Sequence, residues 1–368
     1  MKVLLVAPVV PPYGGMALQA QQLSALLQRD GVQVATFATN FMLPRAVRLL
    51  ERVPGLRTIL RSVLIWPRLR RDVAKVDVVH VMAASWWYFF LVVCPSVLVA
   101  RLCGKRVVVN YRGGEADTFF RRVGPLAAPV FTFASAVTVP SEFLASLIRR
   151  RFDVPVRIVP NVLDHSLFTY RQRAAMRPRM LVTRHLEKIY DIESVLRAFQ
   201  SVQQQRPDAS LWIAGGGSEE ARLRRLVSHW NLRDVRFLGE VAHRDLPAIY
   251  DQCDIYVNAS TVDNFPGALL EASAAGLVIV TTGAGGIPFI YDHGRSAWLV
   301  ETGDWRGLAA GVDHVLRNPA AALEMTSTAR RVALACDWPE VRKQLFDAYG
   351  FSVELPSTSL DGARCVAG

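Results

Sequence analysis

The chain has 368 residues, of which 51% are hydrophobic and 20% charged, and its formal net charge at pH 7 is +11. This length exceeds what one hydrophobic core usually supports, so two globular domains of similar size are expected. The five cysteines form an odd set without C-x-x-C spacing, which indicates neither a disulfide framework nor a zinc site and fits a reducing cytosol.

The excess positive charge lies in the N-terminal half. Residues 1–170 hold 21 Lys and Arg against 9 Asp and Glu. Within them, Phe41–Lys75 has nine basic and two acidic residues, with Leu, Val, Ile and Trp66 interleaved. Such a basic amphipathic stretch fits the interface of an anionic membrane or an anionic lipid carrier, and a solvated helical arm is the alternative. Nucleic acid is not expected as a partner, because no helix-turn-helix, RNP or zinc-finger pattern occurs.

Short apolar runs rich in β-branched residues alternate with helical segments, which predicts parallel sheets covered on both faces. The N-terminal run is interpreted as a strand and not as a signal peptide, because it is short and ends in two prolines. Trp86–Ala100 is apolar but too short to span a membrane and contains Pro95, so a buried crossover helix is predicted there. In the first half the predicted strands are Lys2–Ala7, Gln33–Phe37, Val76–Met82, Arg106–Tyr111, Ala136–Val139 and Arg157–Pro160.

The alternation starts again after a basic segment, Arg171–Arg179, which is interpreted as a linker. We therefore expect a first domain at 1–170 and a second at 171–337, meeting at a cleft. A last helix is predicted near Trp338–Tyr349, and Glu354–Gly368 is expected to be a mobile tail. The predicted strands of the second half are Arg179–Thr183, Ser210–Ala214, Val235–Phe237, Ile255–Asn258, Val278–Thr281 and Ala297–Val300.

A helix start near Asn264 provides a candidate anion site. Asn264 is a favoured cap residue, Pro266 fits the first turn, and Gly276 ends the helix. The free backbone amides and the positive end of the dipole at this start attract phosphate oxygens. Glu271 can accept hydrogen bonds from sugar hydroxyls, and Asp263 lies where a second sugar could be. An ordinary capped core helix with a solvated glutamate is the alternative.

Several segments together resemble, in order and spacing, the family 4 glycosyltransferases of the GT-B fold: PVVPPYGGM, VTVPSEF, VPNVLD, LVTRHLEKIYDIESVLRAF, LWIAGGGSEEARLRRL, VRFLGEV, DNFPGALLEASAAG and GAGGIP. The resemblance covers nearly the whole chain. It implies an α/β protein of two Rossmann-like domains, with an acceptor held by the first and a nucleotide-sugar donor by the second. It also implies retention of anomeric configuration, no metal or other cofactor, and a crossover helix at about 338–352 that packs on the first domain.

The resemblance assigns catalytic roles to three side chains. Glu271 stands at the ribose-binding glutamate of the family, and Asp263 stands where a glutamate facing the donor sugar is usual. Arg184 matches the arginine at the diphosphate, where a guanidinium can stabilise the leaving group. The lysine expected five residues later is absent, because that position is Ile189, and Lys188 is the cation that could replace it.

Glycine-rich turns complete the donor pocket that the resemblance implies. Gly14 and Gly15, after Tyr13, can offer backbone amides to the distal phosphate. Each glycine turn alone would indicate only a chain reversal. The donor-binding residues are predicted to be Gly14, Gly15, Arg184, Lys188, Gly215, Gly216, Val241, Asp263, Asn264, Phe265, Pro266, Gly267 and Glu271.

The acceptor side departs from the family at Arg112, where a histidine is common. Arginine cannot act as a general base at neutral pH, so Arg112 is assigned to phosphate, donor or lipid binding, and Glu115 is a spare candidate base. The departing phosphate can itself take the proton of the acceptor. His80 and His185 are interpreted as structural.

The sequence therefore predicts a glycosyltransferase that moves a sugar from a UDP-, GDP- or ADP-sugar to an acceptor hydroxyl of a lipid-linked glycan or polysaccharide precursor. It is expected in the cytoplasm, at the inner face of the membrane. A nucleotide-sugar epimerase or hydrolase, and a non-catalytic protein that binds a membrane or a partner, are the alternatives. A nicotinamide dehydrogenase is disfavoured because no G-x-G-x-x-G follows the first strand.

Overall fold

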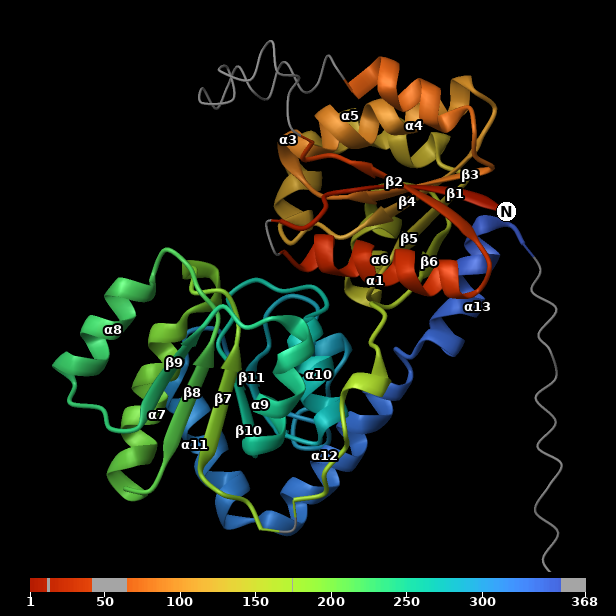
Figure 1. Ribbon diagram of the computed structural model, residues 1–368. Coiled ribbons are helices and arrows are strands. Elements are labelled where there is room, and N and C mark those ends of the chain that lie inside the picture. The colour runs from red at the N-terminus through yellow and green to blue at the C-terminus, as the bar shows by residue number, and fades with distance from the viewer. Residues whose placement is uncertain (12–13, 42–64, 174, 352–368) are drawn as a thin grey trace, which may run out of the picture.

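The computed structural model describes residues 1–11, 14–41, 65–173 and 175–351. They form two α/β domains, each built on a six-stranded parallel sheet (Figure 1). Most of the basic stretch Phe41–Lys75 and the predicted tail lie outside the described residues. Among the described residues, no helix is both long enough and apolar enough to cross a bilayer.

The first sheet has the strand order β2-β1-β3-β4-β5-β6. Residues 65–73 are helical in addition to the labelled helices. The strands are β1 Lys2–Ala7, β2 Gln33–Ala38, β3 Val78–Ala83, β4 Arg106–Tyr111, β5 Ala136–Val139 and β6 Val156–Ile158. The helices are α1 Gly15–Arg29, α3 Trp86–Tyr88, the π-helical turn η2 Phe89–Val93, α4 Cys94–Leu102, α5 Ala116–Phe133, α6 Glu142–Arg151 and the late α13 Trp338–Tyr349.

The second sheet has the order β12-β11-β10-β7-β8-β9. Its strands are β7 Arg179–Thr183, β8 Ser210–Ala214, β9 Val235–Gly239, β10 Ile255–Asn258, β11 Val278–Thr282 and β12 Trp298–Val300. Its α-helices are α7 Ile192–Gln205, α8 Glu220–His229, α9 Leu246–Gln252, α10 Gly267–Ala275, α11 Trp305–Arg317 and α12 Pro319–Leu334. Short 3-10 segments are η3 His165–Leu167, η4 Lys188–Tyr190, η5 His243–Asp245 and η6 Ile287–Phe289. Every strand predicted from the sequence is present, with ends that differ by at most two residues.

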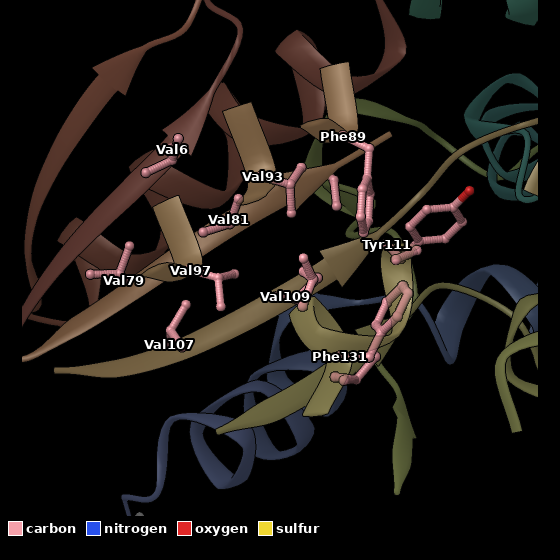
Figure 2. Packing of buried hydrophobic residues seen from close by; sticks show 14 of the residues in the cluster. Val6, Val79, Val81, Phe89, Val93, Val97, Val107, Val109, Tyr111 and Phe131 are labelled. Atoms are coloured by element: carbon pink, nitrogen blue, oxygen red, sulfur yellow. The ribbon is translucent and has the colours of Figure 1, made fainter. Parts of the chain in front are cut away.

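Successive strand residues of the first sheet point to opposite faces, and both faces are buried. On one face, Val79 and Val81 pack with Phe89, Val97 and Phe131 from η2, α4 and α5 (Figure 2). On the other face, a second apolar cluster joins β1 and β3 to α1 and α13. The late helix α13 thus completes the core of the first domain, although it follows the second domain in the chain (Figure 1).

The segment Trp86–Ala100, predicted as one buried crossover helix, differs from that prediction in two ways. It consists of α3, the π-helical turn η2 and α4, and it continues to Leu102. Pro95 does not interrupt it: the proline lies directly after the π-helical turn η2, and the backbone of Val93 and Cys94 stays helical. The prediction of burial is wrong for the outer side, since Trp87 and Leu98 are exposed.

The predicted linker Arg171–Arg179 is bound to the second domain by buried charges. Arg173 is buried and donates hydrogen bonds to the backbone carbonyls of Tyr250, Cys253 and Ala275. The Nε of Arg173 also donates to Oδ1 of the fully buried Asp254 at 3.0 Å. These contacts fix the segment where the chain enters β7.

A buried polar network joins α13 to the first sheet. His80 of β3 lies 2.8 Å through Nδ1 from the Tyr349 hydroxyl and 3.2 Å through Nε2 from Nδ2 of Asn110. Because an amide nitrogen only donates, Nε2 is the acceptor and Nδ1 carries the proton of a neutral imidazole. Burial, with a smaller contribution from Arg112, lowers the pKa of His80 to about 3.

We expect this histidine to make stability depend on pH. The unfolded chain takes up a proton at the ordinary pKa near 6.5, whereas the folded chain does so only near pH 3, so stability is lost as pH falls from 6.5 toward 3. Urea unfolding of the native chain and of His80→Asn at pH 6.5 and at pH 5 measures this effect. Between these two pH values, the free energy of unfolding should fall by about 1.5 kcal/mol more in the native chain than in the variant. An equal decrease in both proteins would contradict the assignment.

Candidate active site

A cavity of about 710 Å³ lies between the two domains. Its first-domain wall comes from the start of α1 and from loops that follow β3, β4, β5 and β6. Its second-domain wall comes from loops that follow β7, β8, β9 and β10 and from the start of α10. In parallel sheets these carboxyl-end loops are the usual ligand site.

The loop before α10 is held by the first domain. The helix begins at Gly267 with Pro266 as its cap residue, which makes no side-chain cap bond. The prediction that Asn264 caps the helix is therefore wrong. Asn264 is buried, and its Nδ2 donates to the carbonyl oxygens of Gly113 at 2.6 Å and Arg112 at 3.2 Å. The predicted end at Gly276 is confirmed by its left-handed backbone, with φ 77°.

Two glycines support the same loop from behind. A Cβ on Gly285 would lie 2.1 Å from the carbonyl oxygen of Asp263, and one on Gly286 would lie 2.0 Å from that of Asn264. The amide of Gly286 donates to the Asp263 carbonyl at 2.8 Å. Glycine is required at both positions because any side chain would displace the backbone of Asp263 and Asn264.

The guanidinium of Arg184 is fixed by three neighbours on the second-domain wall. Its Nη2 donates to Oγ of Ser260 at 3.0 Å and to the carboxylate of Asp263. It also lies over the ring of Tyr190, 4.5 Å from the centroid, in a cation–π contact. Arg184 and Asp263 are thus paired with each other in the protein without a ligand, and their side chains are only 11% and 14% exposed.

Glu271, on the first turns of α10, has both carboxylate oxygens engaged. Oε1 lies 3.0 Å from Nε2 of His243, and Oε2 accepts from the hydroxyl of Tyr250 at 2.9 Å. The hydrogen bond to Glu271 raises the pKa of His243, and burial raises that of Tyr250 well above its usual value. Sequence reasoning missed His243 and Tyr250; the only local signal was that His243 follows Val241, which was assigned to the pocket.

The glycine-rich turn after β8 brings the backbone close to Arg184. Gly215 has φ +146°, and a Cβ there would lie 2.1 Å from the carbonyl oxygen of Arg184. Its amide donates to the carbonyl of Gly239 at 2.7 Å. Gly215, Gly216 and Val241 all line the cavity, on the wall opposite the first domain.

Arg112 connects the two domains through a buried asparagine. Its Nη2 donates to Oδ1 of Asn161, and Nδ2 of Asn161 donates to the carbonyl of Phe265 at 2.9 Å. Arg112 also lines the cavity. Burial lowers the pKa of Arg112 to about 10, so its guanidinium stays charged at neutral pH.

Three residues predicted for the site do not line the cavity. Lys188 is exposed on η4, and the cavity wall beside it is formed by Ile189 and Tyr190. Glu115 is exposed and accepts a hydrogen bond from the indole of Trp86. Gly14 precedes α1 as its cap residue, whereas Gly15 does line the cavity.

The other predicted residues do lie together. The cavity is lined by Gly15, Arg112, Arg184, Gly215, Gly216, Val241, Asp263, Asn264, Phe265, Pro266, Gly267 and Glu271. His185 lines it as well, whereas His80 belongs to the core of the first domain. Tyr13 lies outside the described residues. Within residues 1–11, 14–41, 65–173 and 175–351, no group of three or more His, Cys, Asp and Glu side chains could hold a metal ion.

Comparisons with known proteins identify the family of both halves of the chain. The family model Glycosyltransferase Family 4 matches residues 13–167, and the model Glycosyl transferases group 1 matches residues 171–332. A glycogen synthase of Mycobacterium tuberculosis is 28% identical over 291 residues, which cover 74% of this chain and 68% of that protein. A GDP-mannose-dependent alpha-(1-6)-phosphatidylinositol monomannoside mannosyltransferase of the same organism is 27% identical over 307 residues, covering 76% and 78%.

A solved structure shows the same fold. The crystal structure of HepE from Anabaena in complex with UDP superimposes with a TM-score of 0.75 at 17% identity, covering 95% of this chain and 100% of that one. Both domains are included in this superposition. Since the two family models together match most of the sequence and the two-domain architecture is shared, the chain belongs to the family 4 glycosyltransferases and has the GT-B fold.

Proposed function

We propose that this chain transfers the sugar of a nucleoside-diphosphate donor to an acceptor hydroxyl, with retention and without a metal. The observation that supports this best is the meeting of Arg184, the N-terminus of α10 and Glu271 in one cavity between the domains. The guanidinium and the free amides of the helix start neutralise the diphosphate. Glu271, oriented by His243 and Tyr250, accepts hydrogen bonds from the ribose hydroxyls.

Transfer in this site depends on stabilising the leaving group. The bond between the anomeric carbon and the phosphate oxygen breaks, and a bond from that carbon to the acceptor oxygen forms. The acceptor proton moves to an oxygen of the departing diphosphate, because Arg112 cannot be a base and Glu115 lies outside the cavity. Arg184 stabilises the charge that develops on the diphosphate, and its fixed position removes the need to reorganise during the reaction.

Asp263 has two roles in this proposal. In the protein without donor it holds Arg184, through the ion pair described above. A diphosphate carries more negative charge than one carboxylate, so it replaces Asp263 as the partner of the guanidinium. The carboxylate is then free to accept a hydrogen bond from the donor sugar. Asp263 thus binds Arg184 when the site is empty and the donor sugar when the site is occupied.

The donor is a UDP-, GDP- or ADP-sugar, and the acceptor is a lipid-linked glycan or polysaccharide precursor. Structures of HepE contain UDP and UDP-glucose, and one curated relative uses GDP-mannose, which supports a donor of this class. The membrane and cytoplasmic placement follows from the basic composition of residues 41–75 and from the proposed acceptor. We propose that transfer takes place without a metal and without the lysine whose position Ile189 occupies.

A panel of nucleotide sugars tests the function. We expect one donor class to stabilise the protein by about 2.7 kcal/mol at one hundred times its Kd, measured as an increase in Tm, and to give product only when an acceptor is supplied. Product without acceptor would indicate an epimerase or a hydrolase. No stabilisation by any donor would indicate the non-catalytic alternative.

A further inference from the structure

Large apolar side chains are exposed on the outer side of the first domain. Helices α4 and α5 pack side by side over one face of the first sheet (Figure 1). The exposed residues are Leu98 at 43% and Leu102 at 77% on α4, Leu126 at 68% and Phe133 at 51% on α5, and Trp87 at 76% on the preceding α3. We call these five residues the α4–α5 face. The hydrophobic core of the domain does not account for them, because other residues of the same helices fill it.

The spacing of these residues places them in rows. Leu98 and Leu102 are four residues apart on α4, and Leu126 and Phe133 are seven apart on α5, so each pair lies on one side of its helix. A surface helix normally presents polar residues to solvent. Helix α5 instead buries Phe119 on one side and exposes Leu126 and Phe133 on another.

Basic side chains border the same rows. Arg101 precedes Leu102 directly, and Arg122 lies four residues before Leu126, across the break in α5 at Val123. Arg122 also lies over the ring of Trp86 at 5.8 Å. Neither arginine forms an ion pair with a carboxylate of the described residues, whereas the neighbouring Arg121 is paired with Asp117 at 3.1 Å. The face thus combines apolar rows with two arginines available to an anionic partner.

We propose that the α4–α5 face docks on an anionic lipid bilayer. Leucine and aromatic side chains enter the interfacial region, and the arginines contact lipid phosphates. The exposed apolar side chains and the two exposed arginines match the apolar interior and the anionic headgroups of such a bilayer. A second copy is disfavoured, because a two-fold interface uses the same patch of both subunits and would gather Arg101 and Arg122 of both copies in one contact.

One end of this surface, at Trp87, lies near the cavity that we assign to transfer. Ala84 lines the cavity, and Trp87 of the α4–α5 face follows it three residues later. Leu102 and Phe133 end their helices at the opposite edge of the sheet, where β4 and β5 begin. The residues of this surface lie outside the basic stretch Phe41–Lys75 in the sequence, and its binding to lipid does not depend on the proposed sugar transfer.

Vesicle flotation without any sugar tests the proposal. We expect the full chain to float with vesicles that contain phosphatidylglycerol and to float less with phosphatidylcholine alone. The triple variant Leu102→Ser, Leu126→Ser, Phe133→Ser should bind at least about tenfold more weakly, because it removes three buried apolar groups from the interface. Arg101→Gln with Arg122→Gln should weaken binding mainly to anionic vesicles at low salt.

Exposed apolar residues of the second domain provide the matched control. Leu334 is 45% and Phe289 is 55% exposed, and serine at both positions should leave flotation unchanged. Far-UV circular dichroism and Tm verify that all variants are folded. Flotation of the triple variant equal to that of the native chain would overturn the proposal. The proposal would also be overturned if the control variant lost as much flotation as the triple variant. The same holds if sedimentation showed that the triple variant loses self-association while its flotation is unchanged.

Discussion

We expect Arg184→Ala to lower kcat/KM for the proposed sugar transfer by roughly a hundred- to a thousandfold, the usual cost of removing one preorganised group at a developing negative charge. The side chain is held by Ser260, Asp263 and the ring of Tyr190, so its charge is already placed where the diphosphate would leave. Steady-state kinetics with a saturating acceptor measures the effect. The loss should appear mainly in kcat, because the charge on the leaving group grows in the transition state.

Lys188→Ala is the matched control for this variant. Lys188 is a cation four residues away in sequence, but it is exposed and does not line the cavity. We expect its kcat/KM to stay within about twofold of the native value, since exposed charges contribute little. If Lys188→Ala lost as much activity as Arg184→Ala, the assignment of the phosphate-binding cation would be wrong.

Alanine in place of Asp254 lowers the free energy of unfolding by about 3 to 5 kcal/mol, the usual cost of leaving a buried cation without its partner. Asp254 is fully buried, and its Oδ1 accepts from Arg171 and Arg173 at 3.0 Å and from Arg177 at 2.8 Å. Burial alone would raise the pKa of Asp254, but the hydrogen bonds and charge of Arg177 outweigh it, so the pKa is lowered. Urea unfolding followed by tryptophan fluorescence measures the loss.

Asp251→Ala provides the comparison at the edge of the same network. Asp251 pairs with Arg171 at 2.9 Å, but its side chain is 60% exposed. An exposed pair contributes at most about 1 kcal/mol, so this variant should unfold close to the native midpoint. Similar losses in the two aspartate variants would show that burial of Asp254 does not determine the stability of the linker.

The strands were predictable because their signal is local. A buried parallel strand is a short β-branched run, and Val78–Ala83 and Val278–Thr282 match the runs seen in the sequence. The end of α10 was predictable for the same reason, since Gly276 alone can adopt the left-handed backbone there without strain. The apolar content of α4 and α5 was visible too, but composition does not show which side of a helix faces solvent.

Contacts between distant segments could not be predicted. Asn264 has the side chain of a cap residue, yet it bonds to carbonyls that lie about 150 positions earlier in the chain. The pairing of His243 with Glu271 joins two elements without any sequence pattern. Lys188 was a reasonable substitute by position, but the 3-10 turn η4 directs Ile189 and Tyr190 to the cavity instead. In each case the contacts of the side chain are determined by tertiary geometry and not by local sequence preference.

The bonds from Asn161 and Asn264 tie donor affinity to the separation of the domains. They join the loop before α10 to the first domain, so this loop loses two of its supports when the domains move apart. Thermodynamic linkage makes the two effects equal: if closure of the domains increases the affinity for the donor by some factor, a bound donor increases the equilibrium constant for closure by the same factor. An acceptor that favours the closed arrangement would therefore also increase the affinity of the protein for the donor.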